Sequence, residues 1–124
     1  MTLTIDVPPN EWLSANDRPI WQVRARKTGA LRRRAAWVAR QQRLTVPTPV
    51  LVVADIGYPR NGKADPNNAS PTVKAILDGL TDAGVWPDDD SDHVIGPLYR
   101  RGPKTDRQGW HAVTLTFTQQ AIPF

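Results

Sequence analysis

Aspartates crowd one short segment of a chain that is basic as a whole. The segment VWPDDDSDHV (residues 85–94) lies in a sequence whose formal net charge is +4. Carboxylates that share a small volume raise one another's pKa values and destabilise a fold. A hard divalent cation such as Mg²⁺ or Mn²⁺ relieves that repulsion through oxygen ligands. The aspartates that could take part in such a site are Asp65, Asp78, Asp88, Asp89 and Asp90.

A helix is expected between Asp65 and the aspartates at 88–90. A helix of about 13 residues is roughly 20 Å long, so these carboxylates meet only if the flanking loops fold back over it. Asp78, in the middle of the expected helix, is nearer to both ends. A metal site is one interpretation of the pattern. The other is a solvated acidic loop that also caps a helix end.

Other kinds of metal site and active site lack their residues. Counted from Asp65 or from Asp88, the sixth residue is not glycine and the twelfth is not glutamate, which excludes an EF-hand. The chain has no cysteine, so thiolate metal sites and cysteine nucleophiles are excluded. No nucleotide-binding glycine motif or serine-hydrolase motif is present. His93 and His111 stand apart in or beside expected strands, which favours structural roles.

Positive charge gathers in residues 18–43, which contain nine Lys or Arg and no acid. Such a segment is typical of a protein with a polyanion partner, although a solvated helix face is the alternative. Trp12, Trp21 and Trp37 lie among these charges, where they could stack on bases or pack in the core. The candidate DNA-binding residues are Arg24, Arg26, Lys27, Arg32, Arg33, Arg34 and Arg40.

The elements that must position these residues fit one domain. A chain of 124 residues, 40% of them hydrophobic, is enough for a single core. No apolar run is long enough to span a bilayer, and the N-terminus is not a signal peptide, so no membrane partner is expected. The expected elements are a strand over 3–7, an irregular stretch over 11–29, a helix over 30–43, a buried strand over 50–58, a helix that begins after an N-cap at Ser70 and ends before Gly84, a strand over 93–99, a hairpin-like turn, and a strand over 110–118.

This β-α-β-α-β-β order predicts a single α+β domain over residues 1–124, with a mixed β-sheet and two main helices. In the last strand, Val113, Leu115 and Phe117 alternate with Ala112, Thr114 and Thr116, so one face is expected to be buried.

A series of motifs runs through residues 63–94. They are Asp65-Pro66-Asn67-Asn68, Lys74 on the following helix, Asp78-Gly79-Leu80, and Ala83-Gly84-Val85-Trp86-Pro87-Asp88-Asp89. In order and spacing this segment resembles the RusA family of Holliday junction resolvases of bacteria and phages. The N-terminal LTIDVPPNEWLSANDR is more loosely similar to the opening strand and loop of that family.

The resemblance implies a RusA-like α+β homodimer that binds four-way DNA junctions and nicks two opposed strands. It implies Mg²⁺ as the cofactor, with Mn²⁺ as a substitute, no small-molecule cofactor, and a cytoplasmic protein encoded by a bacterium or its phage. The catalytic residues would be Asp65, Asp89 and Lys74. The metal ligands would be Asp65, Asn67, Asp88 and Asp89, with Asn68, Asp78 and Asp90 in support.

Two departures from the family pattern leave other functions open. Asn67 stands where the family has an aspartate, and the gap from Asp65 to Lys74 is longer by roughly one helical turn. A DNA-junction or nucleic-acid binding protein of the same fold that does not cleave is therefore the alternative to a nuclease. A small basic RNA-binding module with a structural acidic loop is a third interpretation.

Overall fold

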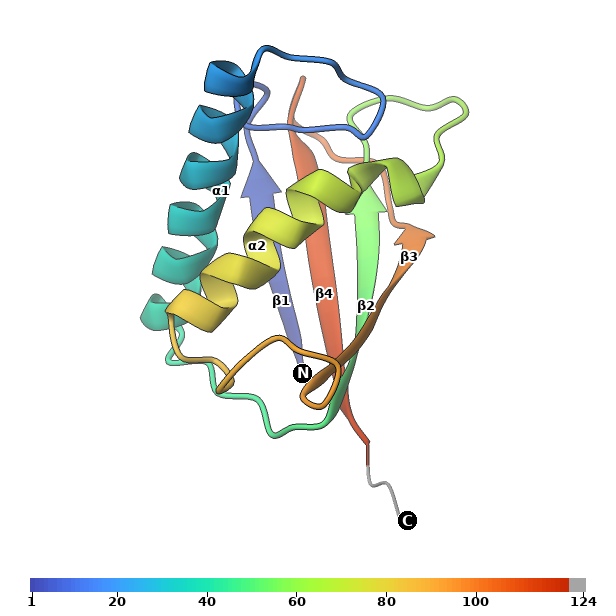
Figure 1. The fold of residues 1–124 in the computed structure, drawn as a ribbon. Coiled ribbons are helices and arrows are strands. Elements are labelled where there is room, and N and C mark those ends of the chain that lie inside the picture. Colours follow the sequence, from blue (N-terminus) through green and yellow to red (C-terminus); the bar gives the residue numbers. More distant parts are fainter. Residues whose placement is uncertain (121–124) are drawn as a thin grey trace.

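The computed structural model describes residues 1–120 and contains four strands, two α-helices and one 3-10 turn (Figure 1). No helix in this part of the chain is long and apolar enough to cross a membrane. In chain order the elements are β1 (Thr2–Val7), α1 (Trp21–Gln41), β2 (Val50–Gly57), η1 (Pro66–Ala69), α2 (Ser70–Asp82), β3 (Val94–Arg101) and β4 (His111–Gln119).

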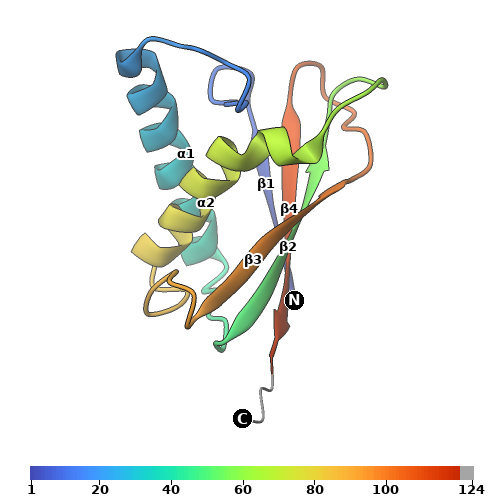
Figure 2. The ribbon, with the colours of Figure 1, turned by 45° about the vertical axis from the view of Figure 1, so that its right-hand side comes forward.

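The four strands form one mixed sheet in the order β1-β4-β2-β3. β4 is antiparallel to both of its neighbours, and β2 and β3 are parallel. Both helices lie on the same face of the sheet, as the two views show (Figures 1 and 2). The single α+β domain with a mixed sheet and two helices is thus confirmed. The expected hairpin between the last two strands is wrong, because β4 inserts between β1 and β2 and the loop after β3 crosses the end of β2.

The core lies between the helices and one face of the sheet. Alternate residues of β1 and β4 are buried, including Ile5, Val113 and Leu115, whereas Thr4 and Thr114 face the other side, where their hydroxyls form a 3.0 Å hydrogen bond. This confirms the alternation predicted for the last strand. Every second residue of a strand points to the same face, so burying one face of the sheet fixes the pattern.

Helix α1 begins nine residues earlier than expected, at Trp21 rather than at residue 30. Its first two turns are mostly exposed, so they carry no apolar stripe that the sequence could reveal. The buried face starts at Leu31 and continues through Ala35, Ala36 and Ala39. Tertiary packing of the second half therefore supports a longer helix than its hydrophobic pattern predicts.

Helix α2 begins directly after the 3-10 turn η1, with Ala69 rather than Ser70 at the N-cap. Its buried face packs on the sheet and on α1. At the crossing of the helices, a Cβ on Gly79 would collide with the Arg32 carbonyl and would lie 3.0 Å from the Ala35 side chain. The helices approach closely because this residue is glycine.

Polar contacts fix the loop between β1 and α1. The buried Thr72 hydroxyl accepts from Leu13 N at 2.9 Å and donates to Leu13 O at 2.7 Å. Arg34 holds Glu11 through two hydrogen bonds of 2.8 and 2.7 Å. These contacts attach the loop to both helices and place its aromatic residue, Trp12, beyond the end of the sheet.

Candidate functional site

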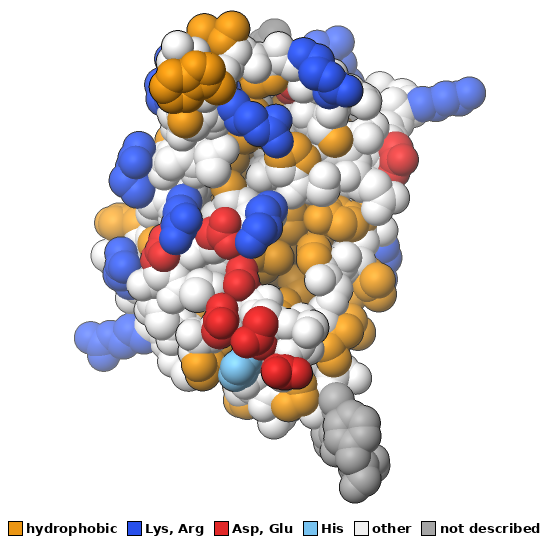
Figure 3. Space-filling model, in the orientation of Figure 1, with side chains coloured by type: hydrophobic (Ala, Val, Ile, Leu, Met, Phe, Trp, Pro, Cys, Tyr) orange, Lys and Arg blue, Asp and Glu red, His pale blue; other side chains and the backbone are white. Residues whose placement is uncertain are grey.

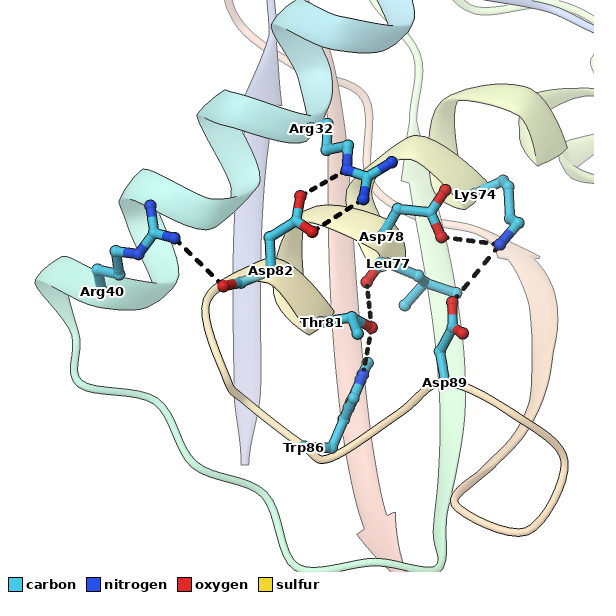
Figure 4. A network of polar contacts seen from close by, with 9 residues as sticks. All are labelled: Arg32, Arg40, Lys74, Leu77, Asp78, Thr81, Asp82, Trp86 and Asp89. Carbon is cyan, nitrogen blue, oxygen red and sulfur yellow. Dashed lines mark hydrogen bonds and ion pairs between the residues drawn. The ribbon is translucent and has the colours of Figure 1, made fainter.

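Lys74 lies at the centre of a small charged cluster on the exposed side of α2 (Figure 4). Its Nζ is 2.7 Å from Asp78 Oδ1 and 3.5 Å from Asp89 Oδ2. Asp78 is on the same helix four residues later, and Asp89 comes from the loop after α2. Two of the predicted catalytic residues, Lys74 and Asp89, therefore meet in one copy of the chain.

The loop over residues 83–93 brings Asp89 back along α2. Trp86 is buried, and its indole N–H donates to the Thr81 hydroxyl at 2.8 Å. Val46 N donates to Val85 O at 3.0 Å, which attaches this loop to the loop before β2. The chain thus turns back at the helix end, and Asp89 reaches a lysine two turns earlier in α2 (Figure 4). The aspartate-rich segment is positioned by its buried tryptophan.

The cluster holds a cation that faces solvent. The Lys74 side chain is 67% exposed, whereas those of Asp78 and Asp89 are 25% and 26% exposed. The hydrogen bond to Asp78 raises the pKa of Lys74, and the charge of Asp89 adds to the effect. Lys74 is therefore an ammonium throughout the neutral pH range, and it presents its charge to any anion that approaches this face.

The other aspartates of this loop make contacts within the loop. Asp88 Oδ1 accepts from Asp89 N at 2.8 Å. Asp90 Oδ1 accepts from Asp92 N at 3.0 Å and lies 2.6 Å from His93 Nδ1. The contact with His93 lowers the pKa of Asp90, and the same contact raises the pKa of His93. Asp88 and Asp90 thus shape the loop that carries Asp89.

Asp65 and its neighbours lie before the other end of α2. The Asp65 carboxylate caps η1, because its Oδ1 accepts from both Asn67 N and Asn67 Nδ2 at 3.0 Å. The Asn68 carbonyl accepts from Ala15 N at 2.8 Å, which attaches η1 to the loop after β1. From Asp65 to Lys74 the chain follows roughly 15 Å of helical path. The predicted metal ligands are therefore divided between the two ends of this segment.

In residues 1–120 of one copy, no three His, Asp or Glu side chains gather closely enough to hold a metal ion. Mg²⁺ in proteins is commonly bound by one or two carboxylates together with waters and substrate phosphate. Asp78 and Asp89 offer two carboxylates of this kind, next to a lysine that attracts phosphate. These donors fit Mg²⁺, and the binding of Mg²⁺ at this site stays a prediction.

The basic helix α1 is partly neutralised by acids from distant segments. Arg32 binds Asp82 through two hydrogen bonds, one of them 2.8 Å, and Arg40 donates to the Asp82 carbonyl at 3.2 Å (Figure 4). Arg34 is paired with Glu11. Lys27 also makes an internal contact, donating to the Trp12 carbonyl at 3.0 Å.

The three remaining candidate DNA contacts on α1, Arg24, Arg26 and Arg33, are exposed, and the structure shows no side-chain hydrogen bond from them to residues 1–120. Figure 3 shows the resulting surface, with acidic side chains gathered over the second half of α2 and the loop that follows, and Lys and Arg over α1 and the opposite end of the molecule. Without a bound cation on the acidic face, a polyanion would therefore approach α1 and that end rather than the acidic loop.

Sequence reasoning missed a second basic region, which lies beyond the ends of β2 and β3. Its cations come from two loops that are distant in sequence, and several of them contact aromatic rings. The members of this region are Arg60, Lys63, Arg101, Lys104 and Arg107. Arg101 lies 5.0 Å from the centre of the Tyr58 ring, and Arg107 lies 3.7 Å from that of Trp110. The signal was the recurrence of Lys and Arg after β2 and again at the end of β3 and beyond it, which a count of one continuous run overlooks.

Comparison with known proteins gives this chain no family. A scan against protein-family models finds no model that matches it, and a search of curated proteins finds no significant match.

Proposed function

We propose that this protein is a Mg²⁺-dependent, structure-selective endodeoxyribonuclease that resolves four-way DNA junctions by paired nicking. The observation that carries the proposal is the meeting of Lys74, Asp78 and Asp89 on the exposed side of α2. These residues come from two segments that resemble the RusA family. A solvent-facing ammonium beside two partly buried carboxylates suits a site for a phosphate and a divalent cation.

The chain's own residues have separate tasks in this proposal. Lys74 binds the phosphate to be cut and stabilises the charge that develops on it. Asp78 holds the lysine in place, and Asp89 with Asp78 would hold the metal. The bound Mg²⁺ would supply an activated water and neutralise phosphate charge. Asp65 does not gather with Asp78 and Asp89 around a common point within residues 1–120 of one copy, so its carboxylate would contribute only across a dimer.

A homodimer completes the proposal. A four-way junction has pairs of strands related by two-fold symmetry, and a two-fold dimer presents two equivalent sites to them. The exposed Arg24, Arg26 and Arg33 on α1 would contact phosphates of the duplex arms. Such contacts make affinity fall steeply as the salt concentration rises.

A DNA-binding protein of the same fold that does not cleave is the second candidate. It is favoured by the lack, within the described residues, of any group of three metal-binding acids or histidines. It is favoured also by Asn67, whose amide brings no charge and donates to Asp65 instead. In this case Lys74, held by Asp78 and Asp89, would contact phosphate without metal.

The test is incubation of the full chain with a synthetic four-way junction, in Mg²⁺, in Mn²⁺ and in EDTA. A linear duplex of the same sequence serves as the control substrate. Symmetrical nicks in the junction that require the metal support the nuclease. Selective binding of the junction without nicks in either metal supports the second candidate. Equal binding of junction and linear duplex contradicts both candidates.

A further inference from the structure

Three loops meet at the end of the sheet where β1, β2 and β3 finish and β4 begins, at the top of Figure 1. They cover residues 8–20, 58–65 and 102–110. The third loop is held against the second, since Thr105 N donates to Tyr58 O at 3.0 Å. Within the third loop, the Thr105 hydroxyl donates to Trp110 O at 2.7 Å. Their side chains form a concave surface, which we call the aromatic–basic groove, made of Trp12, Tyr58, Arg60, Lys63, Arg101 and His111.

The groove consists of three adjoining hollows that share walls. The first, of about 200 Å³, lies between Trp12, Tyr58 and Lys63 and reaches Asp65. The second, of about 350 Å³, is lined by Tyr58 and Lys63 together with Arg60, Arg101 and His111. The third, of about 530 Å³, returns to Trp12 and is also lined by Arg60 and His111. Together they make a series of compartments separated by aromatic side chains.

Flat aromatic rings are the main feature of these walls. Trp12 and His111 stack with ring centres 3.7 Å apart and planes inclined by 4°. Tyr58 meets both rings edge-on, at 6.1 and 5.4 Å. Arg101 lies over the Tyr58 ring and donates to the carbonyls of Arg60 and Gly62, so its guanidinium is fixed to the loop. These contacts hold the rings rigid before any ligand arrives, which lowers the entropy cost of binding.

The charge of the groove suits a phosphate chain. Arg60, Lys63 and Arg101 contribute three cations, whereas Asp65 is the one acid that lines the three hollows and is already bound by Asn67. Alternating cations and aromatic faces are the pattern that binds single-stranded nucleic acid, in which phosphates and bases alternate and the base faces are accessible. A duplex hides its base faces in the stack, so it would leave the aromatic walls unused.

We propose that the aromatic–basic groove binds the unpaired nucleotides of a DNA strand, with bases against Tyr58 and the Trp12–His111 stack and phosphates at Arg60 and Lys63. The choice of DNA rests on the proposed function, since base pairs that open at a branch point would expose base faces to the groove, but the groove needs neither metal nor cleavage to bind. Tyr58 also connects the groove to Asp65, because its hydroxyl donates to the Asp65 carbonyl at 3.4 Å.

The sequence contains two histidines, which supply a probe and its control. His111 lies in the groove, and His93 lies in the acidic loop. We would record histidine ring signals of the full chain by NMR in EDTA while adding an oligothymidylate of about eight nucleotides. The expected result is a ring-current shift of the His111 signal with no change at His93. Binding that moves neither signal, or only that of His93, would overturn the proposal.

Variants test the same groove by affinity, measured as the anisotropy of a labelled oligothymidylate. Tyr58→Leu removes one stacking surface and should weaken binding about tenfold, whereas Tyr58→Phe should retain it. The matched control is Tyr99→Leu, which makes the same change on β3, outside the lining of the three hollows, and should leave affinity unchanged. If Tyr58→Leu fails to fold, Arg60→Gln with Lys63→Gln replaces it and should also weaken binding and reduce its salt dependence.

Three outcomes contradict the groove proposal. They are equal affinity for a duplex of the same length, tighter binding of the matching RNA oligomer, and unchanged affinity in the groove variants. None of them depends on junction cutting, which is measured with Mg²⁺ on a separate substrate. If the junction is not cut but the His111 signal shifts, the protein is a single-strand binding protein. If the junction is cut but the His111 signal does not shift, the protein is a nuclease whose groove has no ligand of this kind.

Discussion

Aspartates at the two ends of the η1–α2 segment have opposite kinds of bonding partner. At the first end, Asp65 is bound by the amides of Asn67, and the cations around it belong to the aromatic–basic groove. Toward the second end, Asp78 and Asp89 share the ammonium of Lys74, and Asp82 binds the guanidinium of Arg32. An acid held by neutral donors keeps its full negative charge, whereas an acid held by a cation has part or all of its charge offset. The same residue type therefore serves a shape-determining role at one end and an electrostatic role at the other.

The two histidines repeat this contrast. His93 is next to Asp90, and that contact raises its pKa. His111 is stacked under Trp12 with a buried Nδ1 that has no hydrogen-bond partner, and burial lowers its pKa to about 4. Environment, rather than residue type, decides which of the two keeps its proton to the higher pH. The histidine of the acidic loop is thus more easily protonated, whereas the histidine of the groove stays neutral.

The largest effect is expected from Asp89→Asn. This change removes a carboxylate that touches Lys74 and would hold the metal, so junction cutting in Mg²⁺ should fall on the order of a hundredfold or more. Binding of the uncut junction should stay within about twofold, because no phosphate contact is lost. Rates are measured by gel analysis of nicked strands.

Asp92→Asn is the matched control for this change. It alters charge equally in the same loop, yet Asp92 contacts Asp90 rather than Lys74. Cutting by this variant should remain near that of the unchanged protein. Equal loss in both variants would show that the total charge of the loop matters and that the Lys74 cluster has no special role.

A second, smaller effect is expected from glycine substitutions that test the packing of α1 against α2. Gly79→Ala places a methyl group against the Arg32 carbonyl and Ala35, and should cost about 1–3 kcal/mol of unfolding free energy. Gly29→Ala, on α1, meets only the flexible Arg33 side chain and should instead stabilise by roughly 0.5–1 kcal/mol. Urea unfolding measures both values. The same sign for both variants would refute the close contact of the helices.

The pH dependence of stability should separate the two histidines. His111 is neutral in the folded state down to about pH 4, whereas in the unfolded chain it titrates near 6.5. The unfolded state binds the extra proton in this interval, so the stability that His111 contributes is present above pH 6.5 and is lost as the pH falls toward 4. His93 has a raised pKa, so its contribution is complete below pH 6.5 and is lost as the pH rises.

His111→Phe and His93→Gln measure these contributions separately. In thermal unfolding at a series of pH values, His111→Phe should flatten the loss of stability on the acid side. His93→Gln should remove a stabilising contact mainly at low pH, so the difference from the unchanged protein should shrink above pH 6.5. Identical pH profiles for the two variants would contradict the contrast between the two regions.

The smallest expected effect concerns two adjacent arginines of α1. Arg33 is exposed, and Arg34 is paired with the nearly buried Glu11. Arg33→Ala should lower the slope of junction affinity against salt concentration by about one phosphate contact, with unchanged stability. Arg34→Ala should instead destabilise the fold, because it leaves the Glu11 carboxylate without its partner. Affinity titrations at several salt concentrations, together with unfolding curves, check both.

The sequence predicted the elements with a buried face and missed those without one. β4 was placed within one residue, because Val113, Leu115 and Phe117 alternate against the helices. The start of α1 was missed by nine residues, because its exposed turns show no periodicity. Strand order was not accessible, since no local pattern indicates that β4 inserts between β1 and β2. Non-local pairing depends on the whole core rather than on any one segment.

The candidate site was predictable where contacts are local in sequence. The Lys74–Asp78 pair follows from a spacing of four residues on a helix. The resemblance alone placed Lys74 and Asp89 in one site, and the loop that brings Asp89 back to Lys74 is held by the buried Trp86. Arg34 was predicted to contact DNA and binds Glu11 instead, because the compensating acid lies outside the basic run. The groove was missed because Trp12, Tyr58 and His111 are separated by about half of the chain at each step.

The position of β4 has a consequence for how the chain reaches its native state. β1 and β2 each form hydrogen bonds to β4 and none to each other, so the sheet stays in two pieces until residues 111–119 have been made. On the ribosome, the helices and the other three strands therefore leave one apolar surface uncovered until β4 is added. Closing a ladder between positions about 110 residues apart is slow compared with local folding, so this apolar surface would be open to chaperones until β4 has paired.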